Sequence, residues 1–314
     1  MHSLVPRREF LQTAGTGLAA VAAAATFPWS VTHGQEAAAP ASGFKKACKL
    51  SMVREGTTIL DKFKVVKAAG YDGIDMDGPP QKHDEVLKAR DETGLVIHGV
   101  VDHPHWTQPL TDPDPKVREA GLAGLQQALR DAKAYGGDTV LLVPGKVTKE
   151  VSYADAYTRS QEEIRKALPL AGELGIKIAI ENVWNMFLLS PLETARFIDE
   201  LQNPLVGAYF DVGNVVNYGW PEHWIRILGK RIMKLDIKEY SRSKRDKSGP
   251  YAGFAVELGE GDCDWPAVLV ALKEIGYQGW CTAEVAGGDT ARLKDVADRM
   301  DRILAIKPAA AAAG

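Results

Sequence analysis

Short apolar runs alternate with amphipathic helical segments about eight times along this 314-residue chain, at spacings of roughly 25 to 40 residues. The apolar runs are mostly continuous rather than strictly alternating, as expected of parallel strands buried on both faces. They occupy residues 48–53, 72–77, 95–101, 138–144, 176–182, 206–212, 231–237 and 279–285. Eight such units predict an α/β protein with a single (β/α)8 barrel, because a doubly wound sheet usually stops at about five or six strands.

Glycine ends several of the amphipathic segments, at Gly70, Gly136, Gly175 and Gly276, which is typical of helix C-termini. No strand is followed by a GxGxxG or GxxxxGK[ST] motif, so the sequence offers no support for nucleotide binding.

The N-terminal segment resembles an export signal. Residues 7–12 read RREFLQ, with paired Arg7 and Arg8, and a weakly apolar Ala- and Gly-rich run follows from Thr13 to Phe27. This pattern resembles a twin-arginine signal, which predicts a periplasmic or otherwise extracytoplasmic protein exported by the twin-arginine route. We therefore expect a signal peptide and linker over 1–42, the barrel over 43–307 and a disordered tail over 308–314.

Composition and charge exclude several classes of binding partner. The net charge of −3 argues against a strongly basic nucleic-acid binder. Cys48, Cys263 and Cys281 are an odd number without metal-like spacing, which excludes a disulfide framework and a cysteine-based zinc site. No apolar run reaches the roughly 20 residues of a membrane span. We expect a small-molecule partner, and a homo-oligomer stays open.

Four carboxylates stand at or near the ends of the last four predicted strands: Glu181, Asp211, Asp236 and Glu284. Functional groups of (β/α)8 barrels lie at the C-terminal ends of the strands. Four buried carboxylates are electrostatically unfavourable unless a cation compensates them. Oxygen ligands favour a hard divalent metal, so we expect Mn²⁺ or Mg²⁺.

Two lysines complicate this interpretation. The two-residue period of a strand places Lys234, Asp236 and Lys238 on one side. Lys238 could offset surplus negative charge or polarise a substrate oxygen. Alternatively, the lysines neutralise the carboxylates and no metal binds.

The segments around these carboxylates resemble the sugar phosphate isomerase/epimerase superfamily, also called the xylose isomerase-like TIM barrels. The similar segments are IAIENVWN, YFDVGNV, IMKLDIKEY and ELGEGDCDWPAVLVALKEIGYQGWCTAE. The resemblance implies that Glu181 and Glu284 are metal ligands and paired acid/base catalysts, and that Asp211 is a ligand. Asp236 stands where the family usually has histidine, which leaves the metal's identity open.

Candidate substrate-binding residues come from the same comparison and from neighbouring strands. Arg242 matches a family position that contacts substrate oxygens, and Asn214 stands where many relatives have a substrate-contacting histidine. His103 follows the third strand, and Trp184 could stack on a sugar ring. Lys238 completes the set. The basic segment 241–253 is either a solvated loop or an attractor of anionic groups.

The activity implied by the resemblance is isomerisation or epimerisation of a sugar, by proton abstraction next to a carbonyl through a metal-stabilised enediolate. Predicted export favours a non-phosphorylated sugar or derivative. A lyase acting on a 3-keto-glycoside would use the same site, and a carbohydrate-binding barrel without catalysis is a third hypothesis.

Overall fold

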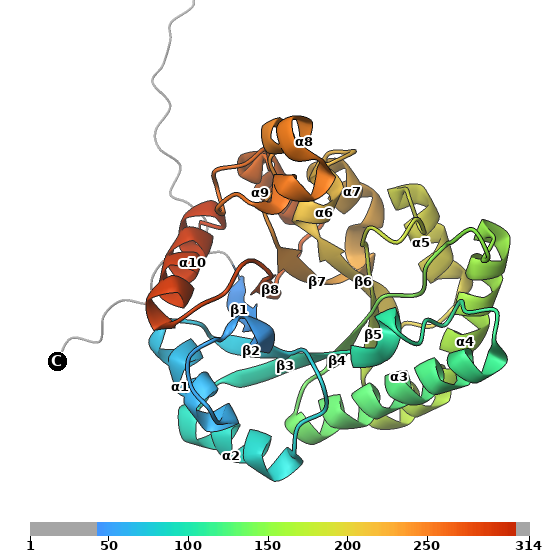
Figure 1. Ribbon diagram of the computed structural model, residues 1–314, viewed down its shortest axis with the longest axis horizontal. Helices are drawn as coiled ribbons and strands as arrows, with labels where there is room; N and C mark the ends of the chain where they lie inside the picture. The colour runs from blue at the N-terminus through green and yellow to red at the C-terminus, as the bar shows by residue number, and fades with distance from the viewer. Residues whose placement is uncertain (1–42, 306–314) are drawn as a thin grey trace, which may run out of the picture. The chain divides into compact units, whose positions relative to one another are not determined.

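The computed structural model describes residues 43–305, which form a closed barrel of eight parallel strands in sequence order (Figure 1). The strands are β1 Lys45–Lys49, β2 Gly73–Met76, β3 Val96–Val101, β4 Thr139–Leu142, β5 Lys177–Glu181, β6 Val206–Asp211, β7 Ile232–Ile237 and β8 Trp280–Ala283. Pairing of β1 with both β2 and β8 closes the barrel. The predicted (β/α)8 fold is thereby confirmed.

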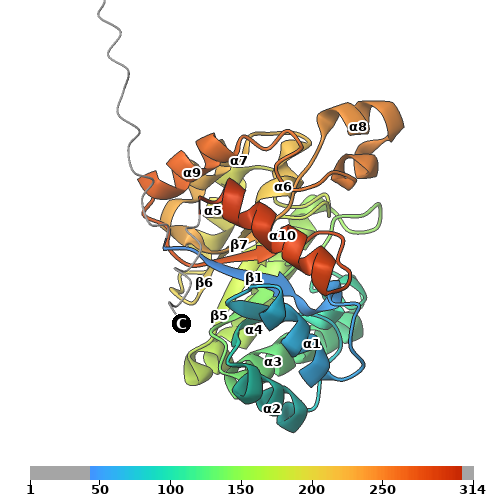
Figure 2. The same cartoon turned by 90° about the vertical axis from the view of Figure 1, so that its left-hand side faces the viewer.

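Helices surround the strands in Figure 1. They are α1 Ile59–Ala68, α2 His83–Thr93, α3 Pro115–Tyr135, α4 Tyr153–Leu174, α5 Pro191–Glu200, α6 Val212–Val216, α7 Pro221–Leu228, α8 Arg242–Ser248, α9 Trp265–Glu274 and α10 Thr290–Ile303. The connecting segments of the described residues also contain four short 3-10 helices: η1 Leu50–Met52, η2 His103–Trp106, η3 Gly229–Arg231 and η4 Pro250–Phe254. Figure 2 shows α8 extending away from the strands at the upper right.

Local sequence signals set several helix ends. Thr58 and Asp61 form a reciprocal capping box at the start of α1, which satisfies backbone N–H groups that lack partners within the helix. Gly136 and Gly175 end α3 and α4 in the left-handed conformation, with φ of 86° and 68°. Both glycines were expected at helix C-termini, and the backbone confirms them.

The first strand begins earlier than predicted. The apolar run suggested a strand from residue 48, but β1 covers Lys45–Lys49, and Leu50–Met52 forms η1. Lysines obscured the strand: Lys45 lies over the Trp280 ring, and Lys46 pairs with Asp301 at 2.6 Å. The aliphatic part of a lysine side chain packs on apolar surface while its ammonium group contacts a polar partner. The sequence of a buried strand can therefore contain lysines and lack a continuous apolar run.

The predicted signal peptide and linker (1–42) and the predicted tail (308–314) lie outside the described residues. Export by the twin-arginine route therefore stays a prediction. Within residues 43–305, no helix has the length and apolar character needed to cross a membrane.

Candidate active site

The four carboxylates meet at one end of the barrel. Glu181 ends β5, Asp211 ends β6, Asp236 lies near the end of β7, and Glu284 directly follows β8. One oxygen from each can be chosen so that all four lie within 4.8 Å of one another. The structure thus brings together the whole predicted ligand set.

Two asparagines hold Asp211 in place. The side chain of Asn182 accepts from the backbone N–H of Asp211 at 2.8 Å and donates to its carbonyl oxygen at 2.8 Å. Asp211 Oδ1 accepts from the backbone N–H of Asn214 at 2.8 Å and so caps α6. This leaves Oδ2 as the oxygen that faces the cluster.

Two lysines contact the carboxylates. Lys49 is the last residue of β1, and Lys238 directly follows β7. Lys49 Nζ lies 3.0 Å from Asp236 Oδ2 and 3.2 Å from Asp75 Oδ2. Lys238 Nζ lies 2.8 Å from Asp211 Oδ2 and 3.2 Å from Glu284 Oε2. The sequence had indicated Lys238 but not Lys49 or Asp75. A lysine inside an otherwise apolar run was the signal that could have revealed Lys49.

The two glutamates have opposite electrostatic surroundings. Burial raises the pKa of Glu181 well above its usual value, and the neighbouring Glu284 raises it further. Burial also acts to raise the pKa of Glu284, but Lys238 and Lys49 hold it below its usual value. Without a metal, Glu181 therefore favours its protonated form and Glu284 its ionised form. Paired carboxyl groups with separated pKa values are typical of acid/base catalysis.

The remaining two carboxylates also fit a cation site. Burial raises the pKa of Asp211, and it raises that of Asp236 well above the usual range. Asp236 Oδ1 is buried without a hydrogen-bond partner among residues 43–305. When all groups are ionised, the four carboxylates outnumber the two ammonium groups by two charges, which one divalent cation would offset. An all-oxygen donor set fits Mn²⁺ or Mg²⁺.

A cleft of about 740 Å³ opens above this cluster. It is lined by Glu181, Glu284, Lys238, Asn214, Trp184, Trp106, Tyr251 and Phe254, together with smaller side chains. Three predicted substrate-binding residues, Asn214, Lys238 and Trp184, therefore border the cleft. Trp184 is fixed there by donating from Nε1 to the carbonyl oxygen of Asn214 at 2.8 Å.

Two predicted substrate-binding residues do not line the cleft. Arg242 donates to the carbonyl oxygens of Val216 and Gly219 at 2.9 and 2.8 Å, and its guanidinium lies over the Trp220 ring. These two hydrogen bonds tie the guanidinium to the backbone that follows α6. The sequence position of Arg242 could not reveal this orientation, which depends on how two loops pack.

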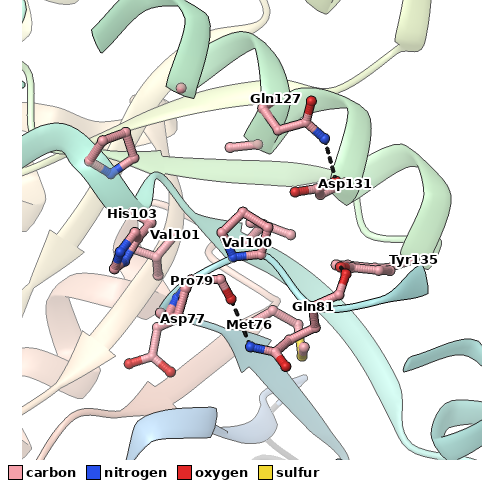
Figure 3. A pocket seen from close by; sticks show the side chains of 15 residues that line it. Met76, Asp77, Pro79, Gln81, Val100, Val101, His103, Gln127, Asp131 and Tyr135 are labelled. Atoms are coloured by element: carbon pink, nitrogen blue, oxygen red, sulfur yellow. Dashed lines mark hydrogen bonds between the residues drawn. The ribbon is translucent and has the colours of Figure 1, made fainter. Parts of the chain in front are cut away.

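His103 lies beside a different cavity of about 210 Å³, bordered by α3 and the segment after β2 (Figure 3). The walls of this cavity are largely apolar, including Met76, Val100 and Val101. At one side Gln127 donates to Asp131 at 2.8 Å. The predicted contact of His103 with a substrate in the carboxylate cleft is therefore not supported.

The chain belongs to the xylose isomerase-like TIM barrel family, whose model matches residues 63–305. L-ribulose-5-phosphate 3-epimerase UlaE of Salmonella paratyphi C is 22% identical over 260 residues, covering 76% of this chain and 89% of the relative. An uncharacterized protein of Methanocaldococcus jannaschii is 23% identical over 208 residues, covering 63% of this chain and 66% of that protein.

Solved structures share the fold. A D-tagatose 3-epimerase-like protein superposes with a TM-score of 0.70 at 19% identity, covering 83% of this chain and 98% of that one. A 3-keto-D-glucoside 4-epimerase from E. coli gives a TM-score of 0.69 at 17% identity, with the same coverage. These likenesses establish a common barrel architecture.

Proposed function

We propose that this protein is a metal-dependent sugar epimerase or isomerase that moves a proton on a carbon next to a carbonyl group. The observation that carries the proposal is the pair of glutamates at one cleft. Glu284 is ion-paired with Lys238 at 3.2 Å, whereas Glu181 has no ion pair among residues 43–305. One carboxylate is thus suited to take a proton and the other to give one.

The proposed reaction conserves all atoms and electrons. Ionised Glu284 takes the proton from carbon, and the electron pair of the C–H bond moves toward the carbonyl oxygen. Protonated Glu181 then returns a proton to the opposite face of the same carbon, which gives the epimer. Return to the neighbouring carbon instead, together with transfer of the hydroxyl proton from the oxygen of the first carbon to the oxygen of the second, gives the isomer. Lys238 can donate a hydrogen bond to the oxygen that gains negative charge.

Glu181, Asp211, Asp236 and Glu284 would hold the metal. When bound, a divalent cation acts as a Lewis acid on substrate oxygens and orients them. Asn182 and Asn214 keep Asp211 oriented through the hydrogen bonds described above, and Lys49 does the same for Asp236.

An uncharged sugar suits the cleft best. Lys238 is the cation that lines it among the described residues, and Asp211 and Glu284 already neutralise this lysine. The cations of the basic segment do not line the cleft. Lys244 donates to the carbonyl oxygen of Ala255, and Arg245 donates to that of Asn217 at 2.6 Å. A phosphate group in the cleft would therefore find no unpaired cation among the side chains that line it.

Similar proteins support this class of activity. The names of the relatives above include a sugar-phosphate 3-epimerase and a 3-keto-glucoside 4-epimerase. Because identities are near 20%, these names support a sugar substrate and leave its configuration to be measured.

Deuterium exchange tests the proposal. The protein, purified without chelators and checked for metal by elemental analysis, is incubated in D2O with neutral ketoses, aldoses and 3-keto-glycosides. NMR then follows loss of the C–H signal. Exchange with formation of an epimer or isomer supports the proposal, whereas expulsion of a substituent indicates a lyase. Saccharide binding without exchange in the metal-supplemented protein indicates the non-catalytic alternative.

A further inference from the structure

Four aromatic side chains extend the carboxylate cleft outward. Trp106 comes from η2, Trp184 follows β5, and Tyr251 and Phe254 come from η4. All four line the same cavity as Glu181 and Glu284. We call these four side chains the aromatic rim.

Two rings of the aromatic rim are far more exposed than Glu181. Glu181 is 7% exposed, whereas Trp106 is 46% and Tyr251 73% exposed. Trp184 and Phe254 are partly buried. Large apolar rings left open to solvent beside a concave site commonly mark a binding surface.

Most of the aromatic rim is held in place relative to the carboxylates. The Trp184 ring packs against Phe254 and Tyr251, with centroid distances of 4.9 and 5.2 Å. The indole N–H of Trp184 bonds to Asn214, whose own backbone N–H bonds to Asp211. The rings on this side are therefore ordered before any ligand arrives, which lowers the entropic cost of binding.

The cleft is also larger than one sugar ring requires. Its volume of about 740 Å³ lies well inside the range of sites that enclose drug-sized ligands. A pyranose ring that contacts the glutamates leaves the outer part of the cleft to another group. Aromatic rings favour a partner with an apolar face, and the side chains that line the cleft include no unpaired cation for a charged group.

We propose that the aromatic rim is a second subsite, which binds a ring attached to the reacting sugar, so that the substrate is a glycoside rather than a free monosaccharide. The attached ring is either an aromatic aglycone or a second sugar, which share the apolar face that the rim contacts. This inference rests on the proposed function for the position of the reacting sugar.

Binding measurements on the intact Mn²⁺-supplemented protein test the subsite. The probes are methyl glycosides, phenyl glycosides and β-linked disaccharides in the gluco, galacto and manno series, titrated by calorimetry. In at least one series we expect a phenyl glycoside or disaccharide to bind more tightly than its methyl counterpart. Tightening by the phenyl group alone identifies an aromatic aglycone, and tightening by the disaccharide identifies a second sugar.

The variant Tyr251→Ala should weaken binding of the preferred ring-substituted probe by about 3- to 10-fold more than it weakens binding of the methyl glycoside. Tyr218→Ala is the matched control, because Tyr218 is 47% exposed and does not line the cleft. Equal affinity for all probes, binding of none, or equal losses in both variants would overturn the subsite. Ring preference without deuterium exchange would instead overturn only the epimerase.

Discussion

The barrel interior holds two polar layers that differ in how their groups are paired. The upper layer consists of the four carboxylates with Lys49 and Lys238. The lower layer is a hydrogen-bonded chain that reaches Lys49 from below, formed by Lys234, His98, Thr282, Tyr209 and Asp75. Both layers are buried and both contain charges, yet only the upper one borders a cleft.

Every side chain of the lower layer has a partner in this chain. Lys234 Nζ lies 3.0 Å from His98 Nδ1, and His98 Nε2 lies 3.2 Å from Thr282 Oγ1. Burial and Lys234 keep the pKa of His98 well below its usual value, so the ring is neutral. Nδ1 then accepts from the ammonium, and Nε2–H donates to Thr282.

The series of hydrogen bonds continues from Thr282 to Asp75. Its hydroxyl lies 2.9 Å from that of Tyr209, which donates to Asp75 at 2.9 Å. Oδ1 of Asp75 and Oδ1 of Asp236 are both buried without a hydrogen-bond partner among residues 43–305. The upper layer differs in its surplus negative charge, which lies beside a cleft. Paired polar groups specify the fold, whereas unpaired ones at a cleft are available to a ligand.

The largest expected effect tests the upper layer. Glu284→Gln and Glu181→Gln should each lower deuterium exchange by about 10²- to 10⁴-fold, because each removes a proton-transfer group. Glu181→Gln should not lower the melting temperature of the metal-free protein, because it removes a carboxyl group that is unfavourable to ionise. Exposed Glu173→Gln is the matched control. Retained exchange in either site variant would contradict the assigned pair.

The second prediction uses an unpartnered acid outside the cleft. Asp102 follows β3, and neither of its buried carboxylate oxygens has a hydrogen-bond partner within residues 43–305. Burial raises the pKa of Asp102 to about 7. In the unfolded protein, the Asp102 carboxyl group ionises near pH 4. The free energy of unfolding therefore falls as pH rises from about 4 to about 7.

Asp102→Asn removes this loss. The variant should match the wild type near pH 4 and exceed it by up to about 4 kcal/mol at pH 8, measured by urea unfolding across pH. Exchange activity should not change, because Asp102 does not line the cleft. A constant difference at all pH values would show that Asp102 is ionised in the folded state. Lost activity would show that unpartnered groups outside the upper layer also serve function.

Much of the upper layer could be predicted from the sequence, because it depends on local pattern. Apolar runs locate strands, and parallel strands in a closed barrel bring their C-terminal ends together. Glu181, Asp211, Asp236 and Glu284 could therefore be grouped without coordinates. Helix-ending glycines are equally local signals.

The pairing of the lower layer could not be predicted in the same way. Lys234 lies on β7 with Asp236, and Lys238 directly follows that strand. Lys234 nevertheless bonds to Asp138 and His98 instead of joining the upper layer. The contact of Lys49 with Asp236 joins β1 to β7, which is set by barrel closure and not by spacing along the chain. The orientation of Arg242 is set by its hydrogen bonds to the backbone that follows α6. Such contacts depend on three-dimensional register rather than on residue type.

The third prediction tests the lower layer. Tyr209→Phe removes the hydroxyl between Thr282 and Asp75, and it should lower the free energy of unfolding by about 1–3 kcal/mol because buried partners lose a hydrogen bond. Exchange activity should fall far less than in the glutamate variants. Tyr218→Phe, at an exposed position, controls for loss of a hydroxyl. If Tyr209→Phe abolished activity at unchanged stability, the lower layer would be part of the catalytic apparatus.

The smallest expected effect concerns the junction of the layers. Asp236 contacts Lys49 through Oδ2, and its unpartnered Oδ1 is available to a metal. Asp236→His exchanges a hard oxygen donor for an imidazole nitrogen, which should shift the ratio of Mg²⁺ to Mn²⁺ dissociation constants about tenfold toward Mn²⁺.

Calorimetric titration of each metal measures the ratio directly, without relying on turnover. In Asp236→His, Lys49 keeps Asp75 but loses one of its two carboxylate partners, so the double variant Lys49→Met/Asp236→His separates charge from ligand chemistry. A shifted ratio in both variants means that residue 236 contacts the metal. A shift confined to the single variant means that the altered charge balance around Lys49, and not the imidazole ligand, changes the metal preference. An unchanged ratio means that Asp236 does not contact the metal and, like the lower layer, stabilises the fold through its ion pair with Lys49.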